Sequence, residues 1–343
     1  MKFLYEEAKS MIDEGIETEE VLYCPVCKGR GKILYEGLHD RLYQVPGVWG
    51  LLRCTACGSL WLNPRPRPEE IYKCYAEYLT HDDDRNYSTN DKRQDGLGWE
   101  RFKDIVLPGR SKERIILQKM FLIGKCRGRL LDIGCGNGSY LALMRDLGWE
   151  VVGIELDPEA ARIAKERFSL NVLIGSWNNI DLPSESFDAI TLSHVVEHVI
   201  DPYKLLRHCF DLLKPGGKIS ITTPNIRSLG HRVFRGSWCG LDPPRHLVLF
   251  HPESLRCIVQ KSGFRILILS TTDRIASGIF ELSRKILSTG KATNPIDKGQ
   301  KTILQSDLIR MLFVFFEHWG NIISRDFGEE IAILAEKGIQ SNE

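Results

Sequence analysis

A short run of alternating glycines limits what this chain can fold into more than any other feature does. Residues 130–138 read LLDIGCGNG: an apolar stretch, the acid Asp132, then glycine at every second position, with a helix-like run beginning at Ser139. Glycine lets the backbone turn sharply and approach a ligand closely where a strand enters the N-terminus of a helix. The order therefore predicts a strand, a ligand-binding loop and a helix of an α/β fold.

The same alternation continues along the chain. Expected strands lie at residues 130–134, 150–155, 171–175, 187–192, 217–223, 264–270 and 329–335, and expected helices lie at residues 139–147, 158–168, 201–213 and 252–262. Alternation of this kind indicates a parallel sheet covered by helices on both faces. It predicts one α/β domain over residues 111–338. A helical insertion is expected at about 272–328, and its segment 308–319 is interpreted either as a helix packed on the core or as a lid or membrane-surface helix.

An acid after the second strand limits the class of ligand that the glycine loop can bind. Glu155 ends the strand at 150–155, about 20 residues after the glycine loop, where a doubly wound sheet places a carboxylate against ribose hydroxyls. The dinucleotide pattern G-x-G-x-x-G is not met, because position 139 is serine. Asp132, next to the loop, would repel a pyrophosphate and attract a cation. These features favour S-adenosylmethionine over NAD as the ligand.

These motifs resemble the class I S-adenosylmethionine-dependent methyltransferase family. Its first motif, an acid followed by G-x-G-x-G, is matched by Asp132 and the loop, and later landmarks are matched by residues 186–192, 213–217 and 223–225. The chain is most similar to members with an N-terminal four-cysteine ribbon and a Pro-Pro-Arg-His stretch, here residues 243–246, and it also resembles ubiquinone-biosynthesis O-methyltransferases and sugar methyltransferases.

The resemblance implies a fold and a set of cofactor contacts. The fold is a Rossmann-like α/β sheet of seven strands, the last one antiparallel. The residues implied to bind S-adenosylmethionine are Asp132, Gly134, Cys135, Gly136, Gly138, Glu155, Leu156, Ser176, Trp177 and Ser193.

Two C-x2-C pairs in the N-terminal part predict a structural zinc site. The pairs are Cys24 with Cys27 and Cys54 with Cys57, each followed closely by a glycine. Four thiolates close the tetrahedral coordination sphere of zinc and leave no position for substrate. Residues 21–62 are therefore expected to form a zinc ribbon, preceded by a helical extension at 1–20 and followed by a linker with accessory helices at 63–110.

The stretch HVVEH places His194, Glu197 and His198 directly after a strand, at the sheet edge where ligands bind in open α/β folds. These groups can simply cap a following helix. Alternatively, His194 or His246 is a general base. In a third interpretation, all four residues hold a second, divalent metal. Relatives with E-x-x-E-H plus a later histidine bind one, although His194 replaces the first glutamate here.

The predicted function is methyl transfer to an oxygen or carbon of a small molecule, by resemblance a sugar, a glycan precursor or a related metabolite, with a lipid-linked acceptor included. A formal net charge of +1 disfavours nucleic acid. An RNA methyltransferase that binds through the ribbon and a non-catalytic cofactor-binding scaffold remain as alternatives. The N-terminus lacks an uninterrupted apolar run, so we expect a cytoplasmic protein without a transmembrane segment. Oligomeric state is left open.

Overall fold

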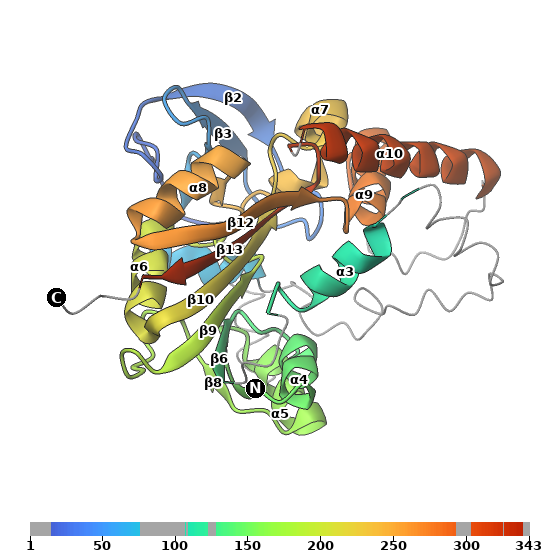
Figure 1. Cartoon of the computed structure of the whole chain (residues 1–343). Coiled ribbons are helices and arrows are strands. Elements are labelled where there is room, and N and C mark those ends of the chain that lie inside the picture. The colour runs from blue at the N-terminus through green and yellow to red at the C-terminus, as the bar shows by residue number, and fades with distance from the viewer. Residues whose placement is uncertain are drawn as a thin grey trace.

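A seven-stranded sheet with the strand order β12-β13-β10-β9-β6-β7-β8 forms the centre of the computed structural model (Figure 1), which describes residues 15–75, 107, 109–122, 128–292, 303–324 and 326–338. Its strands are β6 (Arg129–Ile133), β7 (Glu150–Glu155), β8 (Val172–Ile174), β9 (Phe187–Ser193), β10 (Leu213–Pro224), β12 (Phe264–Thr272) and β13 (Glu330–Lys337). Strands β8, β7, β6, β9 and β10 run parallel, and β13 is antiparallel to both of its neighbours. The expected class I sheet with an antiparallel last strand is confirmed.

The helices between the strands begin where the sequence indicates. They are α4 (Ser139–Asp146), α5 (Pro158–Phe168), α6 (Pro202–Leu212) and α8 (Pro252–Lys261). Helices α5 and α6 each start with proline after an aspartate whose side chain accepts a backbone N–H, at 2.9 Å for Asp157 and 3.1 Å for Asp201. Helices α6 and α8 lie side by side at the β12 end of the sheet, and α4 and α5 cover the β7 and β8 end (Figure 1).

The predicted ribbon is a second sheet that shares a strand with the α/β domain. Its order is β11-β4-β3-β2, with β2 (Gly31–Leu38), β3 (Trp49–Cys54) and β4 (Leu60–Leu62) from the ribbon. Strand β11 (Val248–Leu249) comes from the other end of the chain and pairs antiparallel with β4. The ribbon is thus built into the α/β domain.

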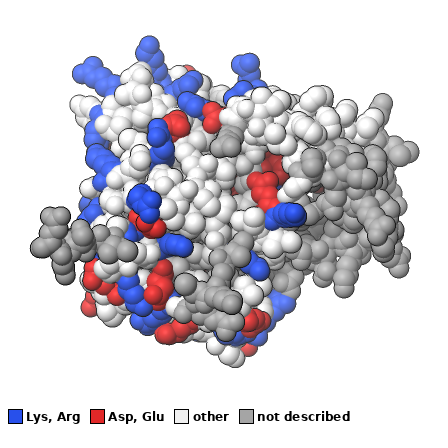
Figure 2. All heavy atoms as spheres, in the orientation of Figure 1, with Lys and Arg blue, Asp and Glu red and all other residues white. Residues whose placement is uncertain are grey.

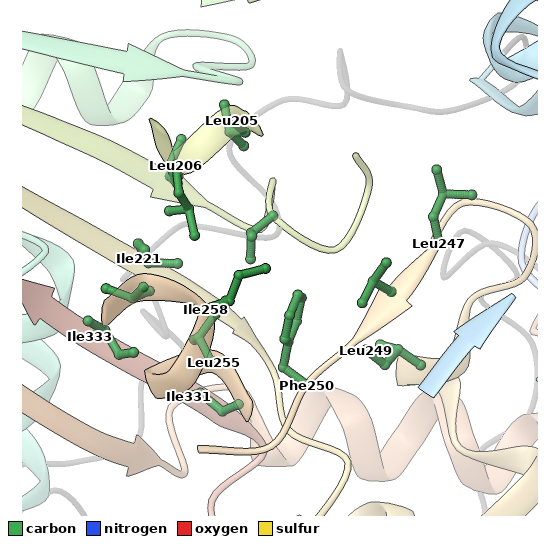
Figure 3. Packing of buried hydrophobic residues seen from close by; sticks show 14 of the residues in the cluster. Leu205, Leu206, Ile221, Leu247, Leu249, Phe250, Leu255, Ile258, Ile331 and Ile333 are labelled. Atoms are coloured by element: carbon green, nitrogen blue, oxygen red, sulfur yellow. The ribbon is translucent and has the colours of Figure 1, made fainter. Parts of the chain in front are cut away.

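One hydrophobic core runs from the ribbon into the large sheet. Trp49 and Trp61 of the ribbon belong to the same buried cluster as Ile221 of β10. Figure 3 shows how the segment after residue 246 bridges the two parts, with Phe250 lying among side chains of α6, α8, β10 and β13; the labelled residues are Leu205, Leu206, Ile221, Leu247, Leu249, Phe250, Leu255, Ile258, Ile331 and Ile333.

Only the end of the expected N-terminal helical extension, residues 15–20, lies in the described part of the chain, and it is not helical. Residues 1–14 lie outside the described part of the chain, and Thr18–Glu19 form strand β1, which pairs with β5 (Arg65–Pro66). An ion pair of 2.7 Å between Arg65 and Glu19 accompanies this pairing. The helix expected at these positions was wrong because a distant strand partner outweighs local helix propensity. The following segment contains the 3₁₀ helix η1 (Pro68–Tyr75) and helix α3 (Arg110–Gln118), with residues 76–106 outside the described part.

The insertion before the last strand is helical, as expected. It consists of α9 (Ala276–Thr289) and α10 (Ile303–Ser324), which pack together through the rings of Phe280 and Phe313, with centroids 5.0 Å apart. Short helices α7 (Leu229–Phe234), η2 (Arg235–Ser237) and η3 (Cys239–Leu241) follow β10. Within the described residues, no helix is long and apolar enough to cross a membrane.

Candidate active site

The glycine loop turns tightly between β6 and α4 and leaves one position open. Gly134, Gly136 and Gly138 have φ angles of +75°, +54° and +79°, which side chains rarely tolerate. A Cβ added at Gly134 would lie 2.7 Å from Val195, and one at Gly138 would lie 2.7 Å from the Cβ of Ala164. At Gly136 the added atom would have no neighbour within 4 Å. The loop therefore offers open backbone at Gly136, as a ligand cradle requires.

Two buried carboxylates flank this loop. Glu155 accepts the backbone N–H of Gly136 at 2.7 Å and that of Asp157 at 2.9 Å. Asp132 accepts a hydrogen bond of 2.6 Å from the hydroxyl of Thr191. Burial raises the pKa of Asp132 to about 7, although the Thr191 bond opposes the shift and the charge of Glu155 adds to it. Burial also raises the pKa of Glu155.

The chemistry of these carboxylates fits S-adenosylmethionine. Among the described residues no cationic side chain forms an ion pair with Asp132 or Glu155. A buried carboxylate without a cation is costly unless a ligand provides one. The amino and sulfonium groups of the cofactor provide positive charge, and its ribose hydroxyls provide donors.

The remaining predicted cofactor residues differ in their surroundings. Cys135 is buried with its thiol against Gly153 of β7, so its backbone is the part left for the predicted contact with the cofactor. Leu156 is 53% exposed beside Glu155. Trp177 packs on the ring of His208, with 5.5 Å between centroids, and adjoins the half-buried Ser176. The hydroxyl of Ser193 lies 3.3 Å from that of Thr222, at the edge of β9 and β10.

His194 has carboxylates on both sides of its ring. The segment from His194 to His198 is a turn, not the helix start that the spacing suggested, and His194 has a φ of +54°. Its Nδ1 lies 3.2 Å from Glu197 Oε1, and its Nε2 lies 2.8 Å from Glu330 Oε1. Burial disfavours the charged ring, but both carboxylates outweigh it and raise the pKa of His194 well above the ordinary value. With both nitrogens carrying protons, this ring has no lone pair with which to act as a base.

Glu330 connects His194 to the insertion. The carboxylate also accepts hydrogen bonds from Arg274, at 3.0 Å from Nε and 2.5 Å from Nη2. On the other side of the ring, Glu197 accepts a 2.9 Å bond from the hydroxyl of Thr223. Despite burial, His194 lowers the pKa of Glu197 to about 2. Sequence reasoning missed Arg274 and Glu330; the antiparallel last strand was the available signal, because its first residue lies at the same edge as the ends of the parallel strands.

Glu197, His198 and His246 form a separate cluster whose ligand atoms all lie within 4.8 Å of one another. His198 Nδ1 lies 3.1 Å from the carbonyl of Arg245, and His246 Nδ1 lies 2.8 Å from that of Gly240. Each ring thus donates its Nδ1 proton to a carbonyl and keeps a lone pair on Nε2, an arrangement typical of metal-ligating histidines. Burial and the charge of His246 lower the pKa of His198 to about 4. His194 is not a member, so the expected set of four is corrected to three.

Arg245 connects this cluster to the ribbon, because its carbonyl contacts His198 and its guanidinium contacts Asp40. Its guanidinium is 1% exposed and forms bonds of 2.7 and 2.8 Å to Asp40 of the ribbon and of 2.5 Å to Asp242. Tyr75 of η1 also contacts His198, with 3.0 Å between its hydroxyl and Nδ1. Sequence reasoning missed these contacts, because nothing local marks Asp40 or Tyr75 as a neighbour of a histidine far along the chain.

The four ribbon cysteines come together as predicted. The Sγ atoms of Cys24 and Cys57 are 3.6 Å apart, those of Cys27 and Cys54 are 3.4 Å apart, and all four lie within 4.8 Å of one another. Tetrahedral zinc at 2.3 Å from each sulfur separates thiolates by roughly 3.8 Å, so the donor set fits that ion. The hydrogen bond from Cys24 lowers the pKa of Cys57, and bonds from Ser59 add to this.

Comparison with known proteins gives two kinds of match. Residues 110–269 match the family model described as "Methyltransferase domain". Among curated proteins, the chain is 41% identical over 103 residues to the ubiquinone biosynthesis O-methyltransferase of Xanthomonas oryzae pv. oryzae (strain PXO99A), covering 28% of this chain and 43% of that protein. The corresponding protein of Xanthomonas campestris pv. campestris (strain B100) is 40% identical over the same length. The chain spans less than half the length of these relatives.

Solved structures match at lower identity and with TM-scores below 0.5. A SAM-dependent methyltransferase from Archaeoglobus fulgidus matches with 24% identity and a TM-score of 0.43, covering 70% of this chain and 99% of that one. Phosphoethanolamine N-methyltransferase 2 from Haemonchus contortus, solved with S-adenosyl-L-methionine, matches with 18% identity and a TM-score of 0.46, covering 81% and 63%.

Proposed function

We propose, from the class I methyltransferase domain that residues 110–269 of this chain form, that the protein transfers the methyl group of S-adenosylmethionine to an oxygen or carbon of a small-molecule acceptor. One observation carries the proposal. The glycine loop with its two buried carboxylates opens at the same sheet edge as Glu197, His198 and His246. A cofactor-binding loop and proton-accepting groups at one sheet edge are what methyl transfer requires.

The chain's own residues bind and orient the cofactor. Asp132 and Glu155 provide negative charge and hydrogen-bond acceptors, and Gly136 lets the ligand approach the backbone. The cofactor, when bound, supplies an electrophilic methyl group with a good leaving group. Proximity and orientation then account for much of the rate, because a held acceptor reacts as if at high concentration.

His246 is the group that accepts the acceptor's proton in this proposal, and His198 lies beside it. Each keeps a lone pair on Nε2, because its Nδ1 is bound to a carbonyl. The pKa of His198, lowered to about 4, keeps its ring neutral but makes it a weak base, so His198 assists by position, as His194 does by its charge.

The same three side chains support a second candidate, a divalent metal site. Two imidazoles and one carboxylate suit a transition metal, and their carbonyl partners orient the rings as metal sites do. Glu197, His198 and His246 would hold the ion, which would lower the pKa of an acceptor hydroxyl. We also propose that Cys24, Cys27, Cys54 and Cys57 hold a structural zinc.

The acceptor class is proposed as a sugar, a glycan precursor or a related metabolite. The curated relatives are named as O-methyltransferases, which supports an oxygen acceptor. Figure 2 shows Lys and Arg prevailing over α8 and β12, but both signs intermingled over α4 and α5. This face is not of a single sign, and the net charge of +1 likewise gives no overall positive field of the kind typical of RNA-binding enzymes.

A labelled-methyl assay tests the proposal. Purified protein receives methyl-labelled S-adenosylmethionine with sugar, phenolic, lipid and RNA acceptors in parallel. We expect label in a small-molecule fraction, and we expect Glu197→Gln to lower turnover by about a hundredfold or more while cofactor binding is kept. Glu166→Gln, whose side chain is 63% exposed on α5, is the matched control and should behave as wild type.

Two outcomes would contradict the small-molecule proposal, and a third would exclude the metal candidate. Label found only in RNA would establish the RNA alternative. Cofactor binding without label in any acceptor would favour the non-catalytic scaffold. For the metal candidate, pure active protein that contains zinc alone, with turnover unaffected by a chelator that leaves the ribbon zinc bound, would exclude the second ion.

A further inference from the structure

A cavity of about 70 Å³ lies where the ribbon packs on the α/β domain. It is lined by residues of the ribbon and by residues that follow β10, among them Leu34, Arg53, Leu60, Arg227, His231 and His251. A water-sized group needs roughly 10–15 Å³ of such space, so the cavity has room for about five to seven of them. Among the described residues it shares no lining with the glycine loop or with the cluster of Glu197, His198 and His246. It is therefore a second cavity, large enough for a small ligand group.

The charged side chains of this lining are cations. Arg53 comes from β3 of the ribbon and Arg227 from the turn after β10, and no acid is among the described lining residues. The charges of two negative groups reach His251. Of these, Asp326 is paired with Arg227 at 3.3 Å, and Cys57 belongs to the proposed zinc set. Both are thus engaged elsewhere.

Arg53 also has a second cation directly beside it. Lys32 of β2 is its cross-strand partner, so both side chains lie on the same face of the ribbon sheet. Both are exposed, and among the described residues neither forms an ion pair. Like charges directly opposite each other destabilise a pair of strands. A bound anion would offset this repulsion.

The charges of both arginines act on the histidines of the lining. Burial lowers the pKa of His231, and the positive charge of Arg53 adds to this effect. Burial also lowers the pKa of His251; a hydrogen bond to the carbonyl of Cys57 opposes the shift, and the charge of Arg227 adds to it. Both rings are therefore neutral at neutral pH, and the positive charge at the cavity belongs to the arginines.

We propose that this cavity binds a phosphate group, either free or carried by a small molecule, between Arg53 and Arg227. Guanidinium groups bind phosphate through pairs of parallel N–H donors, which suits two arginines that come from different parts of the chain. Leu34, Leu60 and Ile226 give the cavity apolar walls. Such walls lower the local dielectric constant and strengthen the attraction between the cations and an anion.

The position of the cavity gives binding a structural consequence. A ligand there would contact β3 and β4 of the ribbon on one side and the residues after β10 on the other. Leu60 of β4 also pairs with Leu249 of β11, so the cavity adjoins the strand that joins the two parts of the chain. A ligand that binds only the folded state stabilises it. The inference goes beyond the proposed function and does not depend on it, because binding is measured without a methyl donor or acceptor.

Calorimetric titration of the full, zinc-loaded chain tests it. The probes are inorganic phosphate and glucose 1-phosphate, with chloride keeping the ionic strength constant. We expect saturable binding and a higher melting temperature. Equal affinity for the two probes would indicate a site for the free anion, and tighter binding of glucose 1-phosphate would indicate a phosphorylated small molecule. Arg53→Gln should weaken binding at least tenfold, because charge-assisted hydrogen bonds are lost. Arg227→Gln should weaken it from the other side of the cavity.

The matched control is Arg284→Gln. Arg284 is an exposed arginine of α9 that does not line the cavity, so this variant should bind phosphate as wild type does. Unchanged melting curves without phosphate would show that the Arg53 and Arg227 variants fold. Absence of saturable binding at millimolar concentrations of both probes, or wild-type binding by Arg53→Gln, would overturn the proposal. So would equal affinity for acetate, because the cavity would then not distinguish a phosphate group from a carboxylate.

Discussion

His194 lies between Glu197 and Glu330 with one ring nitrogen facing each carboxylate, at 3.2 and 2.8 Å. Its neighbours thus determine its chemistry: the same residue type that serves as a base elsewhere here carries two protons. His198, four residues on, has carbonyl and aromatic neighbours and a pKa lowered to about 4. Of the two histidines in this short motif, His194 is therefore charged and His198 is neutral at neutral pH.

A change at Glu330 tests this assignment. Glu330→Gln removes one of the two carboxylates that favour the charged ring, so the pKa of His194 should fall toward its ordinary value. The titration is followed through the ring resonances of His194 by nuclear magnetic resonance. In the wild type we expect an imidazolium at neutral pH. A neutral His194 in the wild type at that pH would contradict the account.

Cofactor affinity should depend on pH through Asp132. Its pKa is raised to about 7, so the carboxylate is ionised above that value and neutral below it. A cationic ligand prefers the ionised form, so affinity for S-adenosylmethionine should fall as pH drops from about 8 to about 6. Asp132→Asn should bind weakly at all these pH values and flatten the profile. Calorimetric titration at each pH provides the measurement, and a flat wild-type profile would exclude the assignment.

The raised pKa of Asp132 also makes the stability of the ligand-free protein depend on pH. Because the native carboxyl holds its proton to a higher pH than the unfolded one, whose pKa is near 3.8, the native state binds more protons between these values. The free energy of unfolding of the ligand-free protein should therefore fall as pH rises through that window.

Local patterns located part of the site. The glycine loop, Glu155, Glu197 and His198 were placed at one edge from their positions after strands, and His246 was found through the family resemblance. Glu330, Arg274 and Asp40 were not found, because each acts through a contact formed only when distant segments pair.

At the scale of elements, the ribbon contacts the site in two ways. Its strand β4 pairs with β11 of the α/β domain, and its Asp40 forms a buried ion pair with Arg245. Strand β11 pairs with β4 directly after His246, and Arg245 bonds to Asp40 with both side chains fully buried. A guanidinium with two carboxylate partners is oriented in a fixed plane. The ribbon thereby fixes the backbone next to His246.

Breaking this pair should affect both stability and turnover. Asp40→Asn leaves the buried guanidinium with one carboxylate, so the free energy of unfolding should fall by about 3 kcal/mol, and turnover should fall because His246 moves. Urea unfolding and the labelled-methyl assay measure the two effects. Asp146→Asn, whose side chain is 68% exposed, serves as control. Wild-type stability and turnover in Asp40→Asn would contradict the role of the ribbon.

The hydrophobic periodicity and the positions of glycine and proline predicted the bounds of most helices and strands well. The strand expected at 150–155 and the helix expected at 158–168 coincide with β7 and α5, because the local signals there agree with the packing. The segment after His194 was mistaken for a possible helix start, since i, i+3, i+4 spacing also occurs in a turn.

Across the whole molecule, the ribbon and the α/β domain share one core. Side chains of the ribbon, of β11 and of the large sheet belong to a single buried cluster (Figure 3). The sequence suggested a separate small domain, because a four-cysteine motif is self-contained in its local signals. The packing of the ribbon on the α/β domain depends on residues 247–250, whose partners lie far away in the chain.

Removal of the zinc proposed for the four cysteines should therefore destabilise the entire molecule. Cys54→Ser should lose the bound metal, and both this variant and chelated wild type should unfold in one transition at lower temperature. Calorimetric scanning with metal analysis gives the measurement, and Cys257→Ser, an exposed thiol outside the cluster, is the control. Two separate transitions, with the α/β domain melting as in the zinc-loaded protein, would show that the core is not shared energetically.

The most direct test of the central claim is calorimetric titration of the zinc-loaded protein with S-adenosylmethionine and, separately, with NAD. The account predicts micromolar binding of the methyl donor, weakened by Asp132→Ala and by Glu155→Ala, and no binding of NAD. Binding of NAD, or no binding of the methyl donor by folded wild-type protein, would contradict the methyltransferase assignment.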